Sequence, residues 1–202
     1  MEYRHQGFIE IDGSYGEGGG KIQFAIHPVH ELKPICLIER GSLRKIRGIS
    51  AVSNLPIHVA ERQKERALKR IREELKVDSE ITLQPHVPSS GPGSFLFLLA
   101  ECEKIFAGFS SLGAKGKPAE KVADEAIDSL KEYMESDGGI DPHLADQIVP
   151  FMALAKGNSC FTTIKMTEHL LTNLWVIGHF LEVKVRKQGD VGRPIKVEFL
   201  NE

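Results

Sequence analysis

Residues 55–77 have the sequence LPIHVAERQKERALKRIREELKV, and the spacing of their apolar side chains predicts one long helix. Pro56 stands near the start, where a helix tolerates proline. The residues expected to face inward are Ala60, Ala67, Leu68, Ile71 and Leu75. The fold therefore includes an amphipathic helix that covers another element.

The opposite face of this helix interleaves basic and acidic side chains. Arginines and lysines between Arg62 and Arg72 alternate with Glu61, Glu65, Glu73 and Glu74. This pattern is typical of a solvated face joined by pairs four residues apart. A basic stripe that binds RNA is the alternative, and the mixture of signs favours the solvated face.

Short apolar segments with strand-like composition flank the helix on both sides. Upstream, IQFAIHPV (22–29), PICLIER (34–40) and SLRKIRG (42–48) predict three strands in a meander or hairpin. The downstream strands are ITLQPH (81–86), SFLFLLAE (94–101) and CEKIFAGFSS (102–111). The unbroken apolar run FLFLL at 95–99 predicts a strand that is buried throughout.

Three further helices and a closing hairpin follow. Helices are expected over 118–136, from Asp141 to Gly157, and from Glu168 to Phe180 with Thr167 as the cap. CFTTIK (160–165) is an expected strand, and VKVRKQ pairs with PIKVEFL across GDVGR. Strand-rich runs with paired helices predict an α+β fold with the helices on one face of each sheet.

Composition limits the classes of protein to which the chain can belong. It has 202 residues and a formal net charge of -2, so no overall field favours non-specific binding of nucleic acid. Cys36, Cys102 and Cys160 are far apart and lack metal-ligand spacing, which predicts reduced thiols in a cytoplasmic protein. No apolar run has the length of a membrane span, and we expect no membrane partner.

The segment GFIEIDGSYGEGGGKIQ (7–23) combines a predicted strand with a glycine-rich turn. Ile9 and Ile11 alternate with Glu10 and Asp12, as in a half-buried strand. The glycine spacing matches neither standard phosphate-binding fingerprint. The residues alone leave two interpretations, a tight turn or a loop that grips phosphate, and favour the turn.

The segment IDPHLADQIVP (140–150) places polar side chains at the start of a predicted helix. His143, Asp146 and Gln147 lie within two turns and can share one solvent-facing edge. The amino end of a helix attracts anions, so a nucleotide phosphate is one expected ligand. Ordinary surface polarity is the alternative, and the residues alone favour it.

The segment KMTEHLLTN (165–173) places His169 at the start of the last predicted helix. Imidazole is nucleophilic and mostly neutral at pH 7, so this histidine is a candidate nucleophile. A histidine in this position is more often only a surface residue.

Five motifs together resemble, in this order, the RNA 3'-terminal phosphate cyclase family. They are EIDGSYGEGGG (10–20), RGISAVSNLPIHVAERQ (47–63), SSGPGS (89–94), HLADQIVPFMALA (143–155) and EHLLTN (168–173). The resemblance implies repeated units of a four-stranded sheet with two helices, plus a smaller inserted domain of βαβ type. It also implies a cytoplasmic, ATP-dependent ligase that converts an RNA 3'-phosphate into a 2',3'-cyclic phosphate.

The resemblance assigns roles to particular residues. His169 corresponds to the nucleophile that becomes a covalent histidine-AMP. His143, Leu144, Ala145, Asp146 and Gln147 match the segment that holds the nucleotide, and His143 takes the place of a ring against the adenine. Glu17 matches the acid near the triphosphate and its divalent metal, Mg²⁺ or Mn²⁺.

The order of the motifs departs from the family pattern. Residues up to Gly20 resemble the amino terminus of the family, whereas from about Lys21 the chain resembles its second half. An alternative alignment places GSYGEGGGKIQ at the opening of the inserted domain, and Glu17 then loses its role. The expected domains are 1–29 with the Gly-rich turn, 30–95 as the inserted domain, and 96–202 as the catalytic repeat.

Two expectations follow from this departure. A non-catalytic module that binds RNA or protein is the alternative function, although the retained His169 favours the enzyme. Strands such as FLFLL and CFTTIK would lose neighbouring units that cover them, which predicts self-association as a homodimer.

Overall fold

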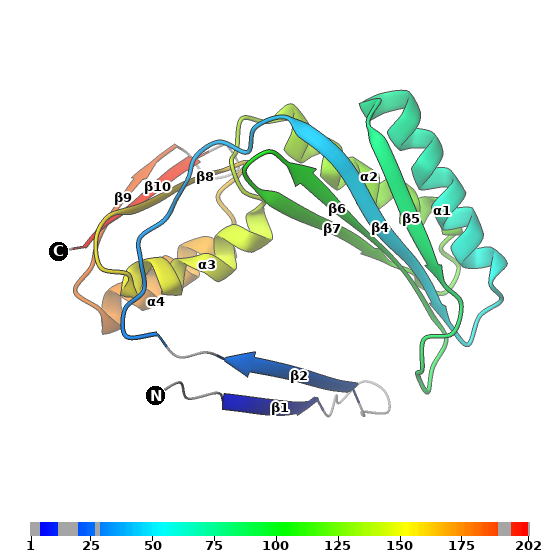
Figure 1. Ribbon diagram of the computed structural model, residues 1–202, viewed down its shortest axis with the longest axis horizontal. Coiled ribbons are helices and arrows are strands. Elements are labelled where there is room, and N and C mark those ends of the chain that lie inside the picture. Colours follow the sequence, from blue (N-terminus) through cyan, green and yellow to red (C-terminus); the bar gives the residue numbers. More distant parts are fainter. Residues whose placement is uncertain (1–4, 12–19, 27–28, 190–194, 202) are drawn as a thin grey trace.

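Two four-stranded sheets, each with two helices against one face, form most of the chain in the computed structural model (Figure 1). The structure describes residues 5–11, 20–26, 29–189 and 195–201; for 5–11 and 20–26 it describes the backbone alone. We call residues 43–135 the first unit, and residues 36–37 with 140–200 the second unit. The predicted α+β class and the helices on one face of each sheet are confirmed.

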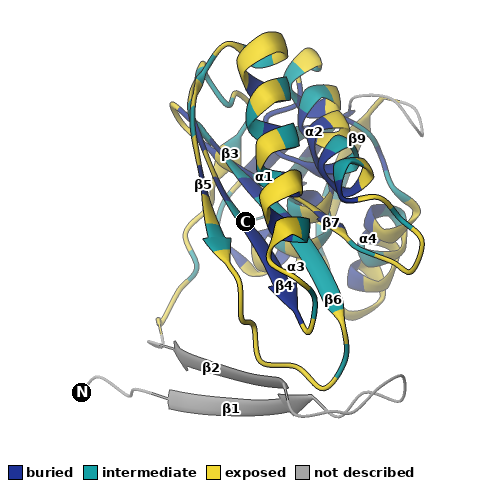
Figure 2. Ribbon diagram, turned by 90° about the vertical axis from the view of Figure 1, so that its right-hand side faces the viewer, coloured by how far each residue is buried: buried dark blue, intermediate teal, exposed yellow. Residues whose placement is uncertain are grey.

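The first unit has the strand order β5-β4-β6-β7. β4 pairs in parallel with β5, while the β4–β6 and β6–β7 pairs are antiparallel. Both helices cover the same face and leave their outer sides exposed (Figure 2). The elements are β4 (Leu43–Ser53), α1 (His58–Arg70), a π-helical turn (Ile71–Leu75), β5 (Asp78–Gln84), β6 (Gly93–Cys102), β7 (Phe106–Leu112) and α2 (Ala119–Glu135).

The helix predicted over 55–77 packs its apolar face onto this sheet. Ala60, Ala67 and Ile71 are fully buried, and Leu68 and Leu75 lie partly buried against the same core. The predicted inward face of the helix is therefore confirmed.

The run at 95–99 is buried on one face of β6 only. Leu96 and Leu98 face the helices and are fully buried, whereas Phe95, Phe97 and Leu99 are partly exposed on the other face. The expectation of burial throughout was wrong because side chains alternate across a strand and both helices cover the same face.

The second unit has the strand order β3-β8-β10-β9, and two helices pack against one face of this sheet. Phe161, Val197 and Phe199 on the strands pack against Val149 and Leu170 on the helices, and all five are fully buried. The elements are β3 (Cys36–Leu37), α3 (Pro142–Leu154), β8 (Ser159–Thr163), α4 (Glu168–Phe180), β9 (Lys184–Gln188) and β10 (Ile195–Leu200).

The strands near the amino terminus do not form the predicted meander. β1 (His5–Ile11) and β2 (Gly20–Ile26) pair with each other in antiparallel register. β3 instead pairs in parallel with β8, and β4 lies in the centre of the first unit. The meander was wrong because β2 pairs with β1, whereas β3 and β4 pair with later segments of the chain and not with each other.

The division into three domains stays a prediction. The predicted boundary between residues 95 and 96 falls inside β6 and would divide the sheet of the first unit. None of the helices in the described ranges has the length and apolar character needed to cross a membrane.

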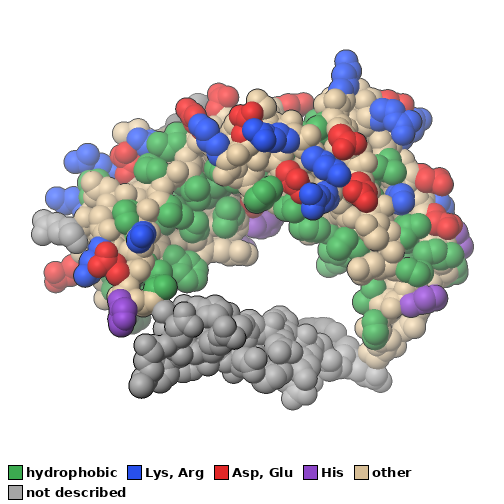
Figure 3. All heavy atoms as spheres, viewed as in Figure 1, with side chains coloured by type: hydrophobic (Ala, Val, Ile, Leu, Met, Phe, Trp, Pro, Cys, Tyr) green, Lys and Arg blue, Asp and Glu red, His purple; other side chains and the backbone are tan. Residues whose placement is uncertain are grey.

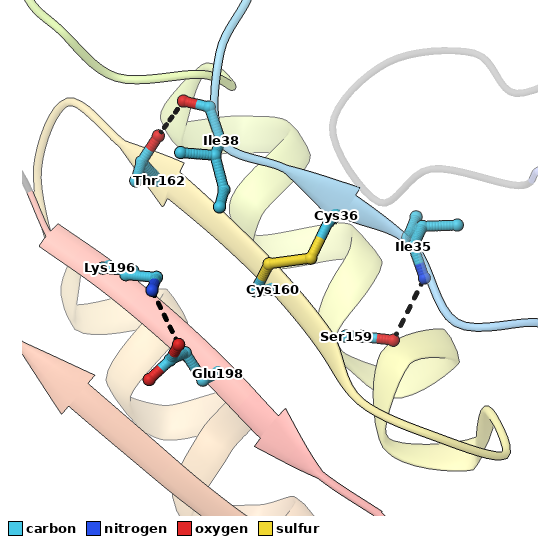
Figure 4. The surroundings of a disulfide bond; sticks show 8 residues. All are labelled: Ile35, Cys36, Ile38, Ser159, Cys160, Thr162, Lys196 and Glu198. Atoms are coloured by element: carbon cyan, nitrogen blue, oxygen red, sulfur yellow. Dashed lines mark hydrogen bonds and ion pairs between the residues drawn. A yellow bond between two sulfur atoms is a disulfide. The ribbon is translucent and has the colours of Figure 1, made fainter.

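Cys36 and Cys160 form a disulfide on the outer face of the second sheet (Figure 4). Their Cα atoms are 4.5 Å apart, because the parallel pairing of β3 with β8 places the two residues opposite each other. The prediction of three reduced thiols was therefore wrong for this pair and holds for Cys102, which is free and buried. A separation of 124 residues left no local cue to the pairing.

Arg40 joins the end of α2 to the segment that leads into the second unit. Its guanidinium donates to the carbonyl oxygens of Met134, Ser136 and Gly138, and it lies 4.7 Å from the ring centroid of Tyr133. The Tyr133 hydroxyl donates to the carbonyl of Gly139 at 2.7 Å. These bonds satisfy carbonyls at the helix end and fix the connection between the units.

The two units together form an arch (Figure 1). Hydrophobic side chains gather on its concave side, and charged side chains gather on its convex side (Figure 3). On α3 and α4, Phe151, Leu154, Trp175 and Phe180 are exposed. The homodimer stays a prediction, and these exposed side chains of α3 and α4 are where a second copy would find apolar contacts.

Acid is expected to weaken the ion pairs that Glu74 forms with Arg70 of α1 and Lys131 of α2. Arg70 and Lys131 hold the pKa of Glu74 at about 2, below its usual 4.5, by hydrogen bonding and charge. A lowered carboxyl pKa stabilises the fold above about pH 4.5, and this contribution is lost as the pH falls toward 2. Urea unfolding should show Glu74→Gln less stable than the parent at pH 7 and equal to it near pH 2.

Glu73→Gln, at the exposed neighbouring position, is the matched control. A difference between the parent and Glu74→Gln that stays constant from pH 7 to pH 2 would contradict this assignment.

Candidate functional site

The first two turns of α3 present the segment HLADQ. Asp141 caps the helix, because its Oδ1 accepts from the backbone N–H of His143 at 2.9 Å and of Leu144 at 3.0 Å. His143 and Gln147 are exposed, and Asp146 is half-buried. Leu144 and Ala145 turn into the core, so only three of the five side chains can reach a ligand.

Thr167 joins the start of α4 to the side of α3. Its hydroxyl oxygen accepts from the backbone N–H of Leu170 at 3.0 Å, as predicted for the cap. The same hydroxyl donates to Asp146 Oδ1 at 2.6 Å. Asn173, one turn farther along α4, donates from Nδ2 to the Asp146 carbonyl at 2.7 Å. Asp146 is thus held by α4 at two points.

His169 lies at this junction with its ring in solvent. Its side chain is 88% exposed, and its Nδ1 is 3.8 Å from Asp146 Oδ2, whose side chain is 14% exposed. This separation is longer than a hydrogen bond, so the carboxylate acts on the Nδ1 side of the ring by its charge, and the Nε2 side is left open for attack. The structure therefore brings together two residues that are 23 positions apart in the sequence.

Two hollows meet at His143, Asp146 and His169. The smaller has a volume of about 180 Å³ and reaches toward the first unit. The larger has a volume of about 350 Å³ and is lined as well by Gln147, Thr172 and Asn173. Both are lined by residues near the beginnings of α3 and α4.

His179 occupies the opposite end of α4 in a different setting. Its Nδ1 is 2.8 Å from the carbonyl oxygen of Trp175, and the two rings lie 4.2 Å apart. No carboxylate partner is recorded for His179 among the described residues.

Glu17 and its Gly-rich turn lie outside the described residues, so its predicted place near the triphosphate is untested. Within the described part of the chain, no three His, Cys, Asp or Glu side chains form a metal-binding group. The metal assignment continues to depend on Glu17.

Sequence reasoning missed two contributions to the site. Asn173 is four residues after His169, a spacing that places it on the same side of α4 and could have indicated it. Lys165 also lines the smaller hollow, where it pairs with Glu132 of α2. Lys165 and Glu132 are 33 positions apart in the sequence, so no local signal indicated that pair.

Comparisons with known proteins place the chain among the relatives of one family. The family model for the insert domain of RNA 3'-terminal phosphate cyclase matches residues 38–135. RNA 3'-terminal phosphate cyclases from Methanopyrus kandleri and Thermococcus onnurineus are both 39% identical, over 98% and 94% of this chain. The cyclase from Pyrobaculum aerophilum is 40% identical over 92% of the chain. The chain spans 58%, 55% and 54% of these relatives, respectively.

Proposed function

Because this chain is a relative of the RNA 3'-terminal phosphate cyclases, we propose that it uses ATP to convert an RNA 3'-phosphate into a 2',3'-cyclic phosphate. The observation that carries the proposal is the exposed His169 ring, which lies 3.8 Å from Asp146 and borders two hollows. A neutral imidazole with one nitrogen directed to a carboxylate is suited to nucleophilic attack through the other nitrogen.

The first step forms a histidine-AMP. Nε2 of His169 attacks the α-phosphorus of ATP, a P–N bond forms, the bond to the β-phosphate oxygen breaks, and pyrophosphate leaves. Asp146 balances the positive charge that develops on the ring as its lone pair is used. Thr167 keeps the carboxylate in place through its 2.6 Å hydrogen bond.

Two further transfers complete the reaction. An oxygen of the RNA 3'-phosphate attacks the same phosphorus, and the P–N bond breaks to free His169. The 2'-hydroxyl oxygen then attacks the RNA 3'-phosphorus, its proton passes to water, and AMP leaves as the ring closes. The neighbouring hydroxyl reacts readily because it is already positioned next to the phosphorus.

The nucleotide would occupy the larger hollow. His143 and Gln147 present exposed side chains there, and Asn173 and Thr172 add polar groups. His143 would stack on the adenine, and Gln147 would form hydrogen bonds with the nucleotide. Mg²⁺ or Mn²⁺ would require Glu17 and groups beyond the described cluster, so no step is assigned to the metal.

Incubation with ATP labelled at the α-phosphate and a divalent metal tests the proposal. We expect covalent label on the chain, stable in alkali and released by acid, followed by transfer to an RNA with a 3'-phosphate. A chain that takes up no label would refute the enzyme. Equal binding of 3'-phosphate and 3'-hydroxyl RNA would then favour the non-catalytic binding module.

Asp146→Asn is expected to slow adenylation about tenfold or more, because the amide cannot balance charge on the His169 ring. The hydrogen bond from Thr167 can persist, so the fold should be retained. Single-turnover labelling rates measure the effect, and Asp137→Asn, at an exposed aspartate outside both hollows, is the matched control for the loss of one carboxylate. An unchanged rate in Asp146→Asn would show that the carboxylate has no part in activating His169.

A further inference from the structure

The smaller hollow has one wall from each unit. Ser129 and Glu132 of α2 and Phe109 of β7 belong to the first unit, while Thr167 and His169 stand on the second. Lys165, between β8 and α4, connects the walls: its Nζ is 3.1 Å from Glu132 Oε1 and 3.4 Å from Oε2. The ion pair therefore links α2 of the first unit to the segment that leads into α4, within the hollow that His169 also lines.

Lys165 is the only lysine or arginine among the described residues that line the hollow. Its side chain is 40% exposed and that of Glu132 is 56% exposed, so water screens their attraction. An ion pair of this kind is weak and can exchange its carboxylate for a more highly charged anion. A lysine in such a pair is available to a ligand.

The size of the hollow limits what it can hold. Its 180 Å³ equals the share of liquid volume of about six water molecules, which suits a phosphate group. The neighbouring 350 Å³ hollow has no lysine or arginine among its described lining residues and suits a larger, uncharged group. His169 borders both and could act on atoms that enter from either side.

We propose that Lys165 binds a phosphate group in the smaller hollow beside His169, and that Glu132 is the internal partner which this phosphate displaces. The inference rests on the proposed function, because it identifies the phosphate subsite of the same centre. Two sources share this chemistry: the 3'-phosphate of RNA, and the β- and γ-phosphates of ATP. An ammonium group recognises either one as a point charge.

The test measures binding by the intact chain and needs no ATP turnover. Fluorescence anisotropy compares one oligoribonucleotide ending in a 3'-phosphate with the same oligoribonucleotide ending in a 3'-hydroxyl, and pyrophosphate serves as a competitor. For Lys165→Met we expect about tenfold weaker binding of the 3'-phosphate form and unchanged binding of the 3'-hydroxyl form. Glu132→Gln should bind the 3'-phosphate form more tightly than the parent, because the internal competitor is lost.

Lys45→Met is the matched control. Lys45 is 30% exposed and pairs with Glu80 at 3.2 Å on the first sheet, outside both hollows. This variant should bind all three probes as the parent does. If Lys45→Met and Lys165→Met lose the same amount of binding of the 3'-phosphate form, the loss comes from the general charge of the chain, and the proposed site is overturned.

The outcomes also separate the two possible sources. If Lys165→Met no longer binds the 3'-phosphate form more tightly than the 3'-hydroxyl form, the subsite belongs to RNA. If the variant loses only the competition by pyrophosphate, the subsite belongs to ATP. Unchanged binding of every probe by Lys165→Met overturns the inference, whether or not the parent forms histidine-AMP. A parent that takes up no AMP label but loses phosphate binding on Lys165→Met would refute the proposed function and retain the subsite.

Discussion

Replacing His169 with asparagine should reduce covalent AMP labelling at least about a thousandfold, because an amide nitrogen has no lone pair available for attack. The ring is 88% exposed and contributes little to the core, so the variant should fold as the parent does. Single-turnover labelling with ATP measures the loss, and circular dichroism checks the fold. The expected loss is large because His169 is the proposed nucleophile itself.

His179→Asn is the matched control, since it removes an exposed histidine from the other end of the same helix. It should label at the parent's rate. Labelling of His169→Asn at a rate close to the parent would place the nucleophile elsewhere and refute the role assigned to this residue. Mapping of the labelled peptide in the parent gives an independent check.

Reduction of the disulfide between Cys36 and Cys160 is expected to lower the free energy of unfolding by about 2–4 kcal/mol. The bond closes a long loop, with 124 positions between its ends, and so restricts the unfolded chain. β3 would then be held to β8 by short backbone pairing and a few side-chain bonds. Urea unfolding with and without a dithiol reductant measures the difference.

The double variant Cys36→Ser with Cys160→Ser provides the control. It should match the reduced parent, and reductant should not change its stability. Cys102→Ser tests the remaining thiol, which is buried and free, and it should keep the response to reductant. Equal stability of the oxidised and reduced parent would contradict the stabilising role of the bond.

Local sequence was sufficient for most elements of the fold. The helices expected over 118–136 and from Glu168 to Phe180 occur at Ala119–Glu135 and Glu168–Phe180, because apolar periodicity and caps act within a few turns. The closing hairpin of β9 and β10 also follows from neighbouring residues. These features depend on interactions between residues that are close in the chain.

The pairing of distant strands was not predicted. The composition of PICLIER predicts a meander with its neighbours, whereas Cys36 and Leu37 pair with β8, whose Cys160 comes 124 residues after Cys36. The disulfide was missed for the same reason. A strand's composition shows that it will pair, but the choice of partner depends on which apolar faces the complete fold can bury.

The sequence by itself determined the α+β class, the helices that carry HLADQ and His169, and the family that the chain resembles. Only the tertiary structure placed Asp146 beside His169 and Lys165 against Glu132 across the two units. It also showed that Leu144 and Ala145 belong to the core. The physical reason is range: helix periodicity and capping act over a few residues, whereas contacts across a site depend on how separate elements pack.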